Sequence, residues 1–220
     1  MNLLESALNL LFPPTCGFCG KINNSYICTS CNKRIQVIQK NKINKYSNKY
    51  YKKHFWMFKY DGEIRKLIIN YKFNDKSYLY RTFVELICNN KQAIEYISKF
   101  DVIIPVPIHK KRLKQRGYNQ SELIAKELCK RIKDIELESK LLLKIKNIKP
   151  QSTLGLDGRV DNIKGAYATN NTIISRIDYL NKKILLLDDV YTTGSTVNEC
   201  SKVLSEITKC EIGIFTIAKD

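Results

Sequence analysis

The sequence predicts an α/β protein in which a parallel sheet is flanked by helices, with a small cysteine-rich module at its N-terminus. Short apolar segments of strand length alternate with amphipathic helical segments from residue 55 to residue 218. The apolar segments lack the polar alternation of a half-exposed strand, which is typical of parallel strands buried on both faces. Two CxxC pairs precede these segments, between residues 16 and 31.

Composition and charge limit the classes of function. The chain has 220 residues, of which 44% are hydrophobic and 27% are charged, and its formal net charge is +17. Such an excess of Lys and Arg favours polyanionic partners, namely nucleic acid, anionic lipid or phosphorylated ligands. The alternative is that the high lysine content follows from AT-rich coding DNA and has no functional role.

The N-terminus carries a short amphipathic segment. Residues 2–12 place leucines on a broad helical face, and Pro13 and Pro14 end any helix there. The segment has no basic start and no cleavage site, so we do not expect a signal peptide. The sequence contains no apolar run of 18 residues, so no transmembrane helix is predicted. We expect a cytoplasmic protein whose N-terminal helix packs on its own domain. Docking on a partner or at the periphery of the inner membrane is the alternative.

The cysteines divide into two groups. Cys16, Cys19, Cys28 and Cys31 form a C-x2-C-x8-C-x2-C pattern, and four thiolates suit a closed, structural zinc site. Gly20 and Asn32 follow the two pairs and tolerate the left-handed backbone that such a turn requires. A dithiol redox centre is the alternative, although one CxxC would suffice for it. The other four cysteines lie in apolar segments and are predicted to be buried without chemistry: Cys88, Cys129, Cys200 and Cys210.

Residues 32–53 are polar, basic and rich in Tyr and Asn. They read as a connector, either a solvated linker or a segment that tracks a nucleic-acid backbone while its tyrosines stack on bases. We therefore divide the chain into residues 1–53, with the N-terminal helix, the four cysteines and the connector, and residues 54–220, with the sheet.

Strands and helices then alternate in order. The predicted elements are a strand and a helix within 56–73, a helix at 79–90, a strand at 101–107, a basic turn at 109–117, a helix capped by Asn119, a strand at 141–145, a long loop at 149–167, a strand at 183–189, a helix at 197–207 and a strand at 210–218. Parallel sheets bind ligands at the carboxyl ends of their strands. The basic turn and the segment after the strand at 183–189 both leave the sheet at that edge.

The segment ILLLDDVYTTGST, residues 184–196, ends a buried strand on two acids. We expect Asp188 and Asp189 on a loop above the sheet, where adjacent carboxylates are costly to desolvate unless ribose hydroxyls or a cation use them. The residues from Thr192 to Thr196 lead into a helix whose free N–H groups form an anion site. Gly194 lets the backbone approach a ligand closely. Together these features describe a cradle for a ribose 5-phosphate.

The same segment resembles the motif with which type I phosphoribosyltransferases bind 5-phosphoribosyl 1-diphosphate (PRPP). Nearly the whole chain resembles the ComF family, the phosphoribosyltransferase-like proteins of bacterial DNA uptake. The resemblance rests on LLFPPTCGFCG with CTSC, FKYDGEIRKLIINYKF, IIPVPIHKKRLKQRGYNQSELIAKEL, QSTLGLDGRVDNIKGAY and LLLDDVYTTGST, in this order. It implies a phosphoribosyltransferase-like fold, with Zn2+ in the cysteine module and Mg2+ bound with PRPP.

Carried over by position, the resemblance implies a set of ligand-binding residues. Those implied for PRPP are Asp188, Asp189, Val190, Tyr191, Thr192, Thr193, Gly194, Ser195, Thr196, Lys110, Lys111 and Arg112. Mg2+ is expected on the diphosphate rather than in a protein cage. The segment 116–120, Arg159 and Asn162 belong to the resemblance, but the sequence gives them no defined role. Tyr118 and Tyr167 stand where the family often has Phe.

Two classes of function follow from the resemblance. The first is a DNA-uptake factor that binds single-stranded DNA and PRPP and works beside a helicase-like or recombination-mediator competence protein. The basic residues expected on DNA are Lys110, Lys111, Arg112, Lys114, Arg116, Lys144 and Lys146. The second is an active phosphoribosyltransferase, for which the sequence names no acceptor and no catalytic residue. A weaker third option is a regulator that senses PRPP without catalysis.

Overall fold

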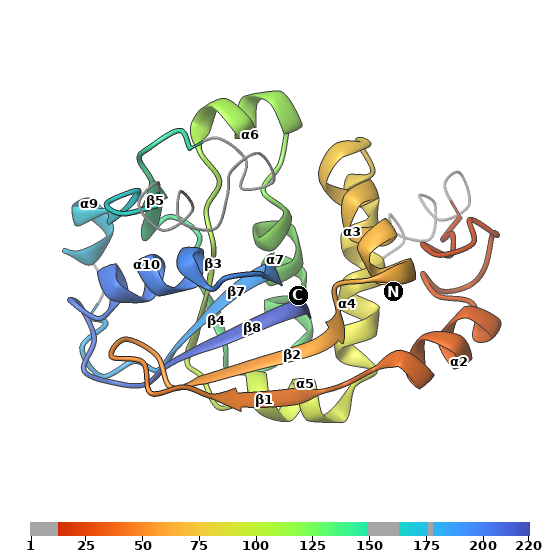
Figure 1. The fold of residues 1–220 in the computed structure, drawn as a ribbon, viewed down its shortest axis with the longest axis horizontal. Coiled ribbons are helices and arrows are strands. Elements are labelled where there is room, and N and C mark those ends of the chain that lie inside the picture. Colours follow the sequence, from red (N-terminus) through yellow and green to blue (C-terminus); the bar gives the residue numbers. More distant parts are fainter. Residues whose placement is uncertain (1–12, 149–162, 176–177) are drawn as a thin grey trace.

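A six-stranded sheet forms the centre of the computed structural model, which describes residues 13–148, 163–175 and 178–220. The strand order is β1-β2-β8-β7-β3-β4, and every neighbouring pair is parallel except β1 with β2 (Figure 1). The strands are β1 (Lys42–Lys45), β2 (Lys53–Lys59), β3 (Val102–Pro105), β4 (Glu136–Leu137), β7 (Ile184–Tyr191) and β8 (Ile212–Lys219). The predicted α/β class with a mostly parallel sheet is confirmed.

Helices cover both faces of this sheet (Figure 1). The helices of the described residues are α2 (Thr29–Ile38), α3 (Gly62–Phe73), the 3-10 helix η1 (Ser77–Leu79), α4 (Tyr80–Cys88), α5 (Lys91–Ile97), α6 (Lys110–Arg116), α7 (Gln120–Arg131), α9 (Asn171–Ile174) and α10 (Ser195–Leu204). Successive strand residues point to opposite faces. Accordingly, Ile103 and Leu185 join a core with α3, α4, α5 and α7, whereas Ile104 and Leu186 join a second core with α10.

The N-terminal cysteine segment is continuous with the first of these cores. Cys16, Ile27, Cys31 and Ile35 are buried in the same cluster as residues of α3 and α4. The backbone N–H of Tyr26 also donates to the Glu85 carboxylate on α4 at 2.7 Å. We call residues 13–38 the zinc module. It packs against the sheet domain rather than standing apart from it.

The segment expected to be a connector, residues 32–53, is built into the fold. It contains most of α2 and the edge strand β1, which pairs with β2 from Lys42↔Trp56 to Lys45↔Lys53. The turn after β1 then reaches α10, where the Asn48 amide donates to Asn198 Oδ1 at 2.8 Å. Base stacking by its tyrosines was one of the two interpretations of this segment. Tyr51, however, is buried, and its hydroxyl lies 3.1 Å from that of Tyr191.

Several other elements differ from the sequence prediction. The basic turn at 109–117 is helix α6, which His109 caps through its Nδ1 and which Gly117 ends at a φ of 80°. The strand expected at 141–145 is β5 (Leu142–Lys144), but it pairs antiparallel with β6 (Tyr167–Thr169) in a separate two-stranded sheet. The short strand β4 takes the edge of the main sheet instead. Helix α5 was not predicted.

Some predictions fall outside the described residues. These are the helix at residues 2–12, most of the loop at 149–167, and Arg159 and Asn162 within that loop. Within residues 13–148, 163–175 and 178–220, no helix combines the length and the apolar character that crossing a membrane requires.

Candidate functional site

The two adjacent acids lie within strand β7, not on a loop above the sheet as the sequence predicted. Asp188 pairs with Thr216 of β8, and the ladder continues to Tyr191↔Lys219. The reason is that β8 extends to Lys219, so β7 keeps its partner for several residues beyond the apolar run. Because neighbouring strand residues point to opposite faces, the two carboxylates take different partners.

Asp188 bonds with neighbouring donors and Asp189 with a lysine. Asp188 Oδ1 accepts from the Ser121 hydroxyl at 3.2 Å and from the Asp189 N–H at 2.9 Å. Asp189 is 5% exposed and pairs with the Lys72 ammonium of α3 at 2.8 Å. Burial, and then the negative charge of Asp189, raise the pKa of Asp188 to about 7. Burial beside a second carboxylate therefore favours the protonated form of Asp188, and a further hydrogen-bond donor or a cation would favour its charged form.

The loop after β7 leads into a helix N-terminus. Gly194 adopts a φ of 80° and is the N-cap of α10, and the Thr193 and Ser195 hydroxyls lie 2.8 Å apart. A Cβ at Gly194 would collide with the Tyr191 hydroxyl, so glycine is required here for space as well as for conformation. The free N–H groups at the start of this ten-residue helix suit an anion.

These groups line one cavity at the carboxyl edge of the sheet, with a volume of about 390 Å3. We call it the carboxyl-edge cavity. It brings together Asp188 and Asp189 from β7, Thr192, Gly194 and Thr196 from the following loop and helix, and side chains of α3, α6, α7 and β5. Its cationic lining residues are Arg65, Lys72, Arg112, Arg116 and Lys144. Five cations against two acids leave a positive potential that suits a polyanionic ligand.

Helix α6 divides the predicted basic residues between two surfaces. Arg112 and Arg116, four residues apart on one helical face, line the carboxyl-edge cavity. Lys110, Lys111 and Lys114 are exposed and lie outside the cavity lining. The sequence prediction of a basic turn could not distinguish the cavity-lining arginines from the exposed lysines, because the difference follows from the helical repeat of α6.

The two lysines predicted after β5 also differ. Lys144 lines the carboxyl-edge cavity, where its ammonium lies 5.0 Å from the centre of the Tyr167 ring, and burial lowers its pKa. Lys146 is exposed and donates to the Lys164 carbonyl at 2.8 Å. Of the two lysines predicted on the DNA surface, Lys144 therefore lines the cavity and Lys146 lies at the exposed surface.

Sequence reasoning missed the α3 side of the cavity. Tyr60, Arg65, Lys72 and Phe73 all line it, together with Ser121 and Gln120 at the start of α7. The segment FKYDGEIRKLIINYKF carried part of the family resemblance, yet nothing in it distinguishes a cavity residue from a solvated one. The side chains of α3 reach the acids of β7 only because the chain folds back on itself.

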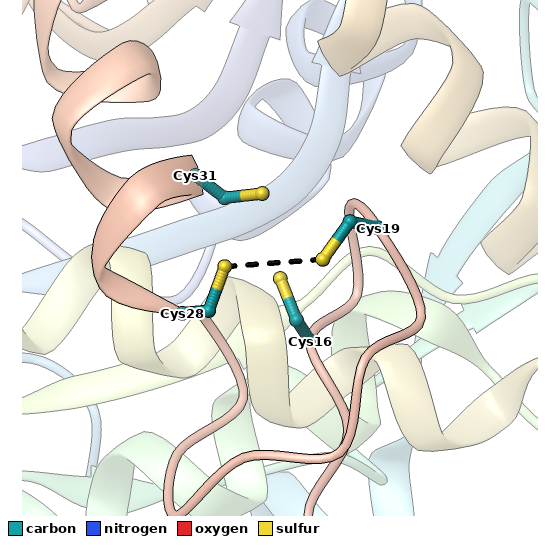
Figure 2. A group of neighbouring side chains, drawn as sticks. All are labelled: Cys16, Cys19, Cys28 and Cys31. Carbon is teal, nitrogen blue, oxygen red and sulfur yellow. Dashed lines mark hydrogen bonds between the residues drawn. The ribbon is translucent and has the colours of Figure 1, made fainter.

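The four cysteines of the zinc module form one metal-binding cluster. Their sulfurs lie within 4.8 Å of one another, and Figure 2 shows them pointing toward a common centre. A tetrahedral zinc with Zn–S bonds of about 2.3 Å requires sulfurs about 3.8 Å apart, and the Sγ atoms of Cys19 and Cys28 are 3.8 Å apart. The four residues therefore fit a structural zinc ion with no open ligand position.

The two CxxC pairs are presented by different backbones. Gly20 adopts the predicted left-handed conformation, with a φ of 73°, and its N–H donates to the Cys16 carbonyl at 2.8 Å. Asn32 does not, because Cys28 is the N-cap of α2 and Cys31 and Asn32 lie in its first turn. The prediction for Asn32 was wrong, since a helix N-terminus can present two thiolates as well as a turn can.

Comparison with known proteins agrees with both parts of the chain. Residues 7–50 match the family model described as a double zinc ribbon domain. Competence protein F of Haemophilus influenzae is 28% identical over 211 residues, which cover 94% of this chain and 85% of that protein. These matches support a ComF-family protein with an N-terminal zinc module. The zinc module is the N-terminal part of the chain, and the sheet with its cavity forms the remainder.

Two further relatives match shorter parts of the chain. Competence protein ComFC of Streptococcus pneumoniae is 23% identical, over 76% of this chain and 68% of its own length. The DNA utilization protein YhgH of Escherichia coli K12 is 30% identical over 104 residues, which are 47% of this chain and 43% of that protein.

Proposed function

We propose that this protein acts in DNA uptake during natural transformation, where it binds single-stranded DNA and, with Mg2+, PRPP. In this proposal it works in the cytoplasm and helps to move or process the incoming strand, with association at the periphery of the inner membrane as the alternative. The names of its relatives, competence proteins and a DNA utilization protein, support the cellular role. The resemblance to ComF proteins also implies that the protein works with a helicase-like or recombination-mediator competence protein.

The observation that carries the proposal is the meeting of two acids, a helix N-terminus and five cations in the carboxyl-edge cavity. Each part matches one part of PRPP. Asp188 and Asp189 accept hydrogen bonds from the two ribose hydroxyls. The loop from Thr192 to Thr196 receives the 5-phosphate through backbone N–H groups and hydroxyls.

The diphosphate lies toward α6 in this proposal. Arg112 and Lys144 line that side of the carboxyl-edge cavity, and an arginine fork suits phosphate oxygens. Mg2+ bound to the diphosphate oxygens would neutralise part of their charge. Lys110 and Lys111 lie at the exposed surface of the same helix and add attraction at longer range.

The exposed lysines also support binding of DNA. Lys110, Lys111 and Lys114 of α6 and Lys146 after β5 are all exposed. Together with the net charge of +17, they favour a nucleic-acid backbone without regard to its sequence. Such binding weakens steeply with salt, because each neutralised phosphate releases counterions.

The test is fluorescence anisotropy of a labelled single-stranded oligonucleotide across a salt series, with and without Mg-PRPP, together with calorimetric titration of PRPP. We expect tight binding that falls with salt, and a shift in DNA affinity when PRPP is present. The double variant D188N/D189N should lose PRPP affinity by roughly 100-fold or more, because two charge-assisted hydrogen-bond acceptors become neutral. Its affinity for DNA in the absence of PRPP should stay unchanged.

Other outcomes separate the alternatives. If the chain binds no DNA at low salt, the proposed DNA-binding role is wrong and the phosphoribosyltransferase hypothesis is favoured. Consumption of PRPP in the presence of an acceptor, lost in D188N/D189N, would establish the phosphoribosyltransferase instead. Unchanged PRPP affinity in the double variant would show that PRPP binds elsewhere or not at all.

A further inference from the structure

The α3 side of the carboxyl-edge cavity carries aromatic rings that the sequence did not suggest as a binding surface. Phe73, the last residue of α3, is 67% exposed although it lines this cavity. The guanidinium carbon of Arg116, at the end of α6, lies 5.2 Å from the centre of the Phe73 ring. In Figure 1, α6 and α3 lie beyond the same edge of the sheet. The ring is therefore held beside a cation but not covered.

A second pair of the same kind lies on the same wall. The Arg65 guanidinium carbon lies 6.0 Å from the centre of the Tyr60 ring, and both residues line the cavity. A single exposed aromatic residue is unremarkable on a protein surface. Two aromatic–guanidinium pairs in the wall of one cavity, next to the acids of β7, are more specific, because ring and guanidinium planes are the surfaces on which nucleobases stack.

Three guanidinium groups of the cavity wall form no ion pair with the described residues. None of the ion pairs that link described residues uses Arg65, Arg112 or Arg116. Burial, and then the charge of Arg112, lower the pKa of Arg116, which is the direction expected for a cation without a close carboxylate partner. As far as the described residues go, these positive charges suit an anionic ligand.

Gln120 adds a third observation. Its side chain is in the cavity wall and the residue is 2% exposed, yet among the described residues its amide Nε2 has no hydrogen-bond partner. An amide group buried without a partner destabilises the fold unless a ligand or water bonds it. A side-chain amide can also both donate to and accept from the edge of a base.

We propose that Tyr60, Arg65, Phe73 and Arg116 form a base-stacking site at the α3 side of the carboxyl-edge cavity, and that it binds an unpaired base of single-stranded DNA. The base stacks on Phe73, Arg65 and Arg116 contact the flanking phosphates, and the Gln120 amide faces the edge of the base. DNA and PRPP then occupy neighbouring parts of one cavity. This inference rests on the proposed function, since it assumes that the chain binds DNA.

A stacking contact and a phosphate contact respond differently to salt, and the test uses that difference. Oligonucleotide affinity is measured by anisotropy across a salt series for the full chain and for Phe73→Ala. We expect roughly tenfold weaker binding at every salt concentration with an unchanged salt slope, because the lost contact is uncharged. In an oligonucleotide that contains 2-aminopurine, the quenching of its fluorescence on binding should decrease in the same variant.

Tyr78→Ala is the matched control. Tyr78 is also an exposed aromatic residue, at 46%, but it lies in η1 outside the cavity lining, so its removal should leave DNA affinity within twofold. Phe73 is exposed, so the variant should fold, and its zinc content and thermal unfolding verify this.

Two results would overturn the inference, and they differ in what else they remove. If the unaltered chain binds DNA and Phe73→Ala binds it equally well, the base-stacking site is wrong and the proposed function stands. If the unaltered chain binds no DNA at low salt, the DNA role and the base-stacking site fall together.

Discussion

The zinc module and the carboxyl-edge cavity are assembled in opposite ways. All four cysteine ligands come from the segment between Cys16 and Cys31, and their spacing alone predicted the cluster. The cavity draws residues from Tyr60 to Val197 and from both sides of the sheet. A site whose ligands are close in sequence can be recognised from spacing, whereas a site whose walls come from distant elements requires the topology.

The two regions should also differ in what their loss does to the protein. The zinc module shares a hydrophobic cluster with α3 and α4, through Cys16, Ile27, Cys31 and Ile35. Removal of zinc should therefore destabilise the packing of α3 and α4 as well as the zinc module itself. The carboxyl-edge cavity lies at the edge of an already complete sheet, so changes there should alter binding more than folding.

The largest effect is expected from Cys31→Ser. Removal of this buried ligand should abolish zinc binding and lower the free energy of unfolding by more than about 4 kcal/mol. The reason is that the free energy of zinc binding contributes directly to the stability of such modules. Elemental analysis and thermal unfolding measure both. Cys129→Ser, at a half-buried cysteine outside the cluster, should keep zinc and change stability far less. Equal melting temperatures for the two variants would contradict a structural zinc.

An intermediate effect is expected from Lys72→Met, which tests a contact between residues far apart in sequence. Asp189 is nearly buried and Lys72 partly so, at 7% and 22% side-chain exposure. Loss of the ammonium leaves the carboxylate without its partner, and we expect destabilisation by roughly 1–3 kcal/mol in chemical unfolding.

A double-mutant cycle sharpens this test. Adding Asp189→Asn to Lys72→Met should recover part of the loss, because the unpaired charge is then gone. Lys66→Met, at an exposed lysine of the same helix, is the control and should change stability by less than about 0.5 kcal/mol. Equal losses for both lysine variants would mean that the Lys72–Asp189 contact contributes nothing.

The smallest effect is expected at the start of α6, where His109 Nδ1 accepts from the Lys111 N–H at 3.2 Å. Burial, and then the charges of Lys110 and Lys111, hold the pKa of His109 below its ordinary value of 6.5. The folded protein therefore prefers the neutral ring. The capping contribution is complete above pH 6.5 and declines as the pH falls through the lowered pKa of the folded state.

Hydrogen exchange measures this cap directly. The protection factor of the Lys111 amide should be lower at pH 5 than at pH 8 in the unaltered chain. In His109→Asn it should be the same at both values, because an asparagine cap does not titrate in this range. An equal pH dependence in both proteins would show that the histidine does not cap the helix as a neutral acceptor.

Sequence patterns predicted those features that depend on neighbouring residues. The apolar runs ending at Asp188 predicted buried parallel strands, the cysteine spacing predicted the zinc cluster, and Asn119 predicted the cap of α7, where its Oδ1 accepts from the Ser121 N–H. Each prediction succeeded because the physical cause, strand burial, metal geometry or a local hydrogen bond, acts within a few residues of chain.

Only the tertiary structure decided the rest. The two acids of β7 remain paired in the sheet because β8 runs alongside them. Lys144 lines the cavity from β5, which pairs with β6 and not with the main sheet. Phe73 and Arg116 meet because α3 and α6 end over the same edge. These contacts join residues tens of positions apart, and no local propensity encodes them. They follow from strand order and helix packing, which exist only once the whole chain has folded.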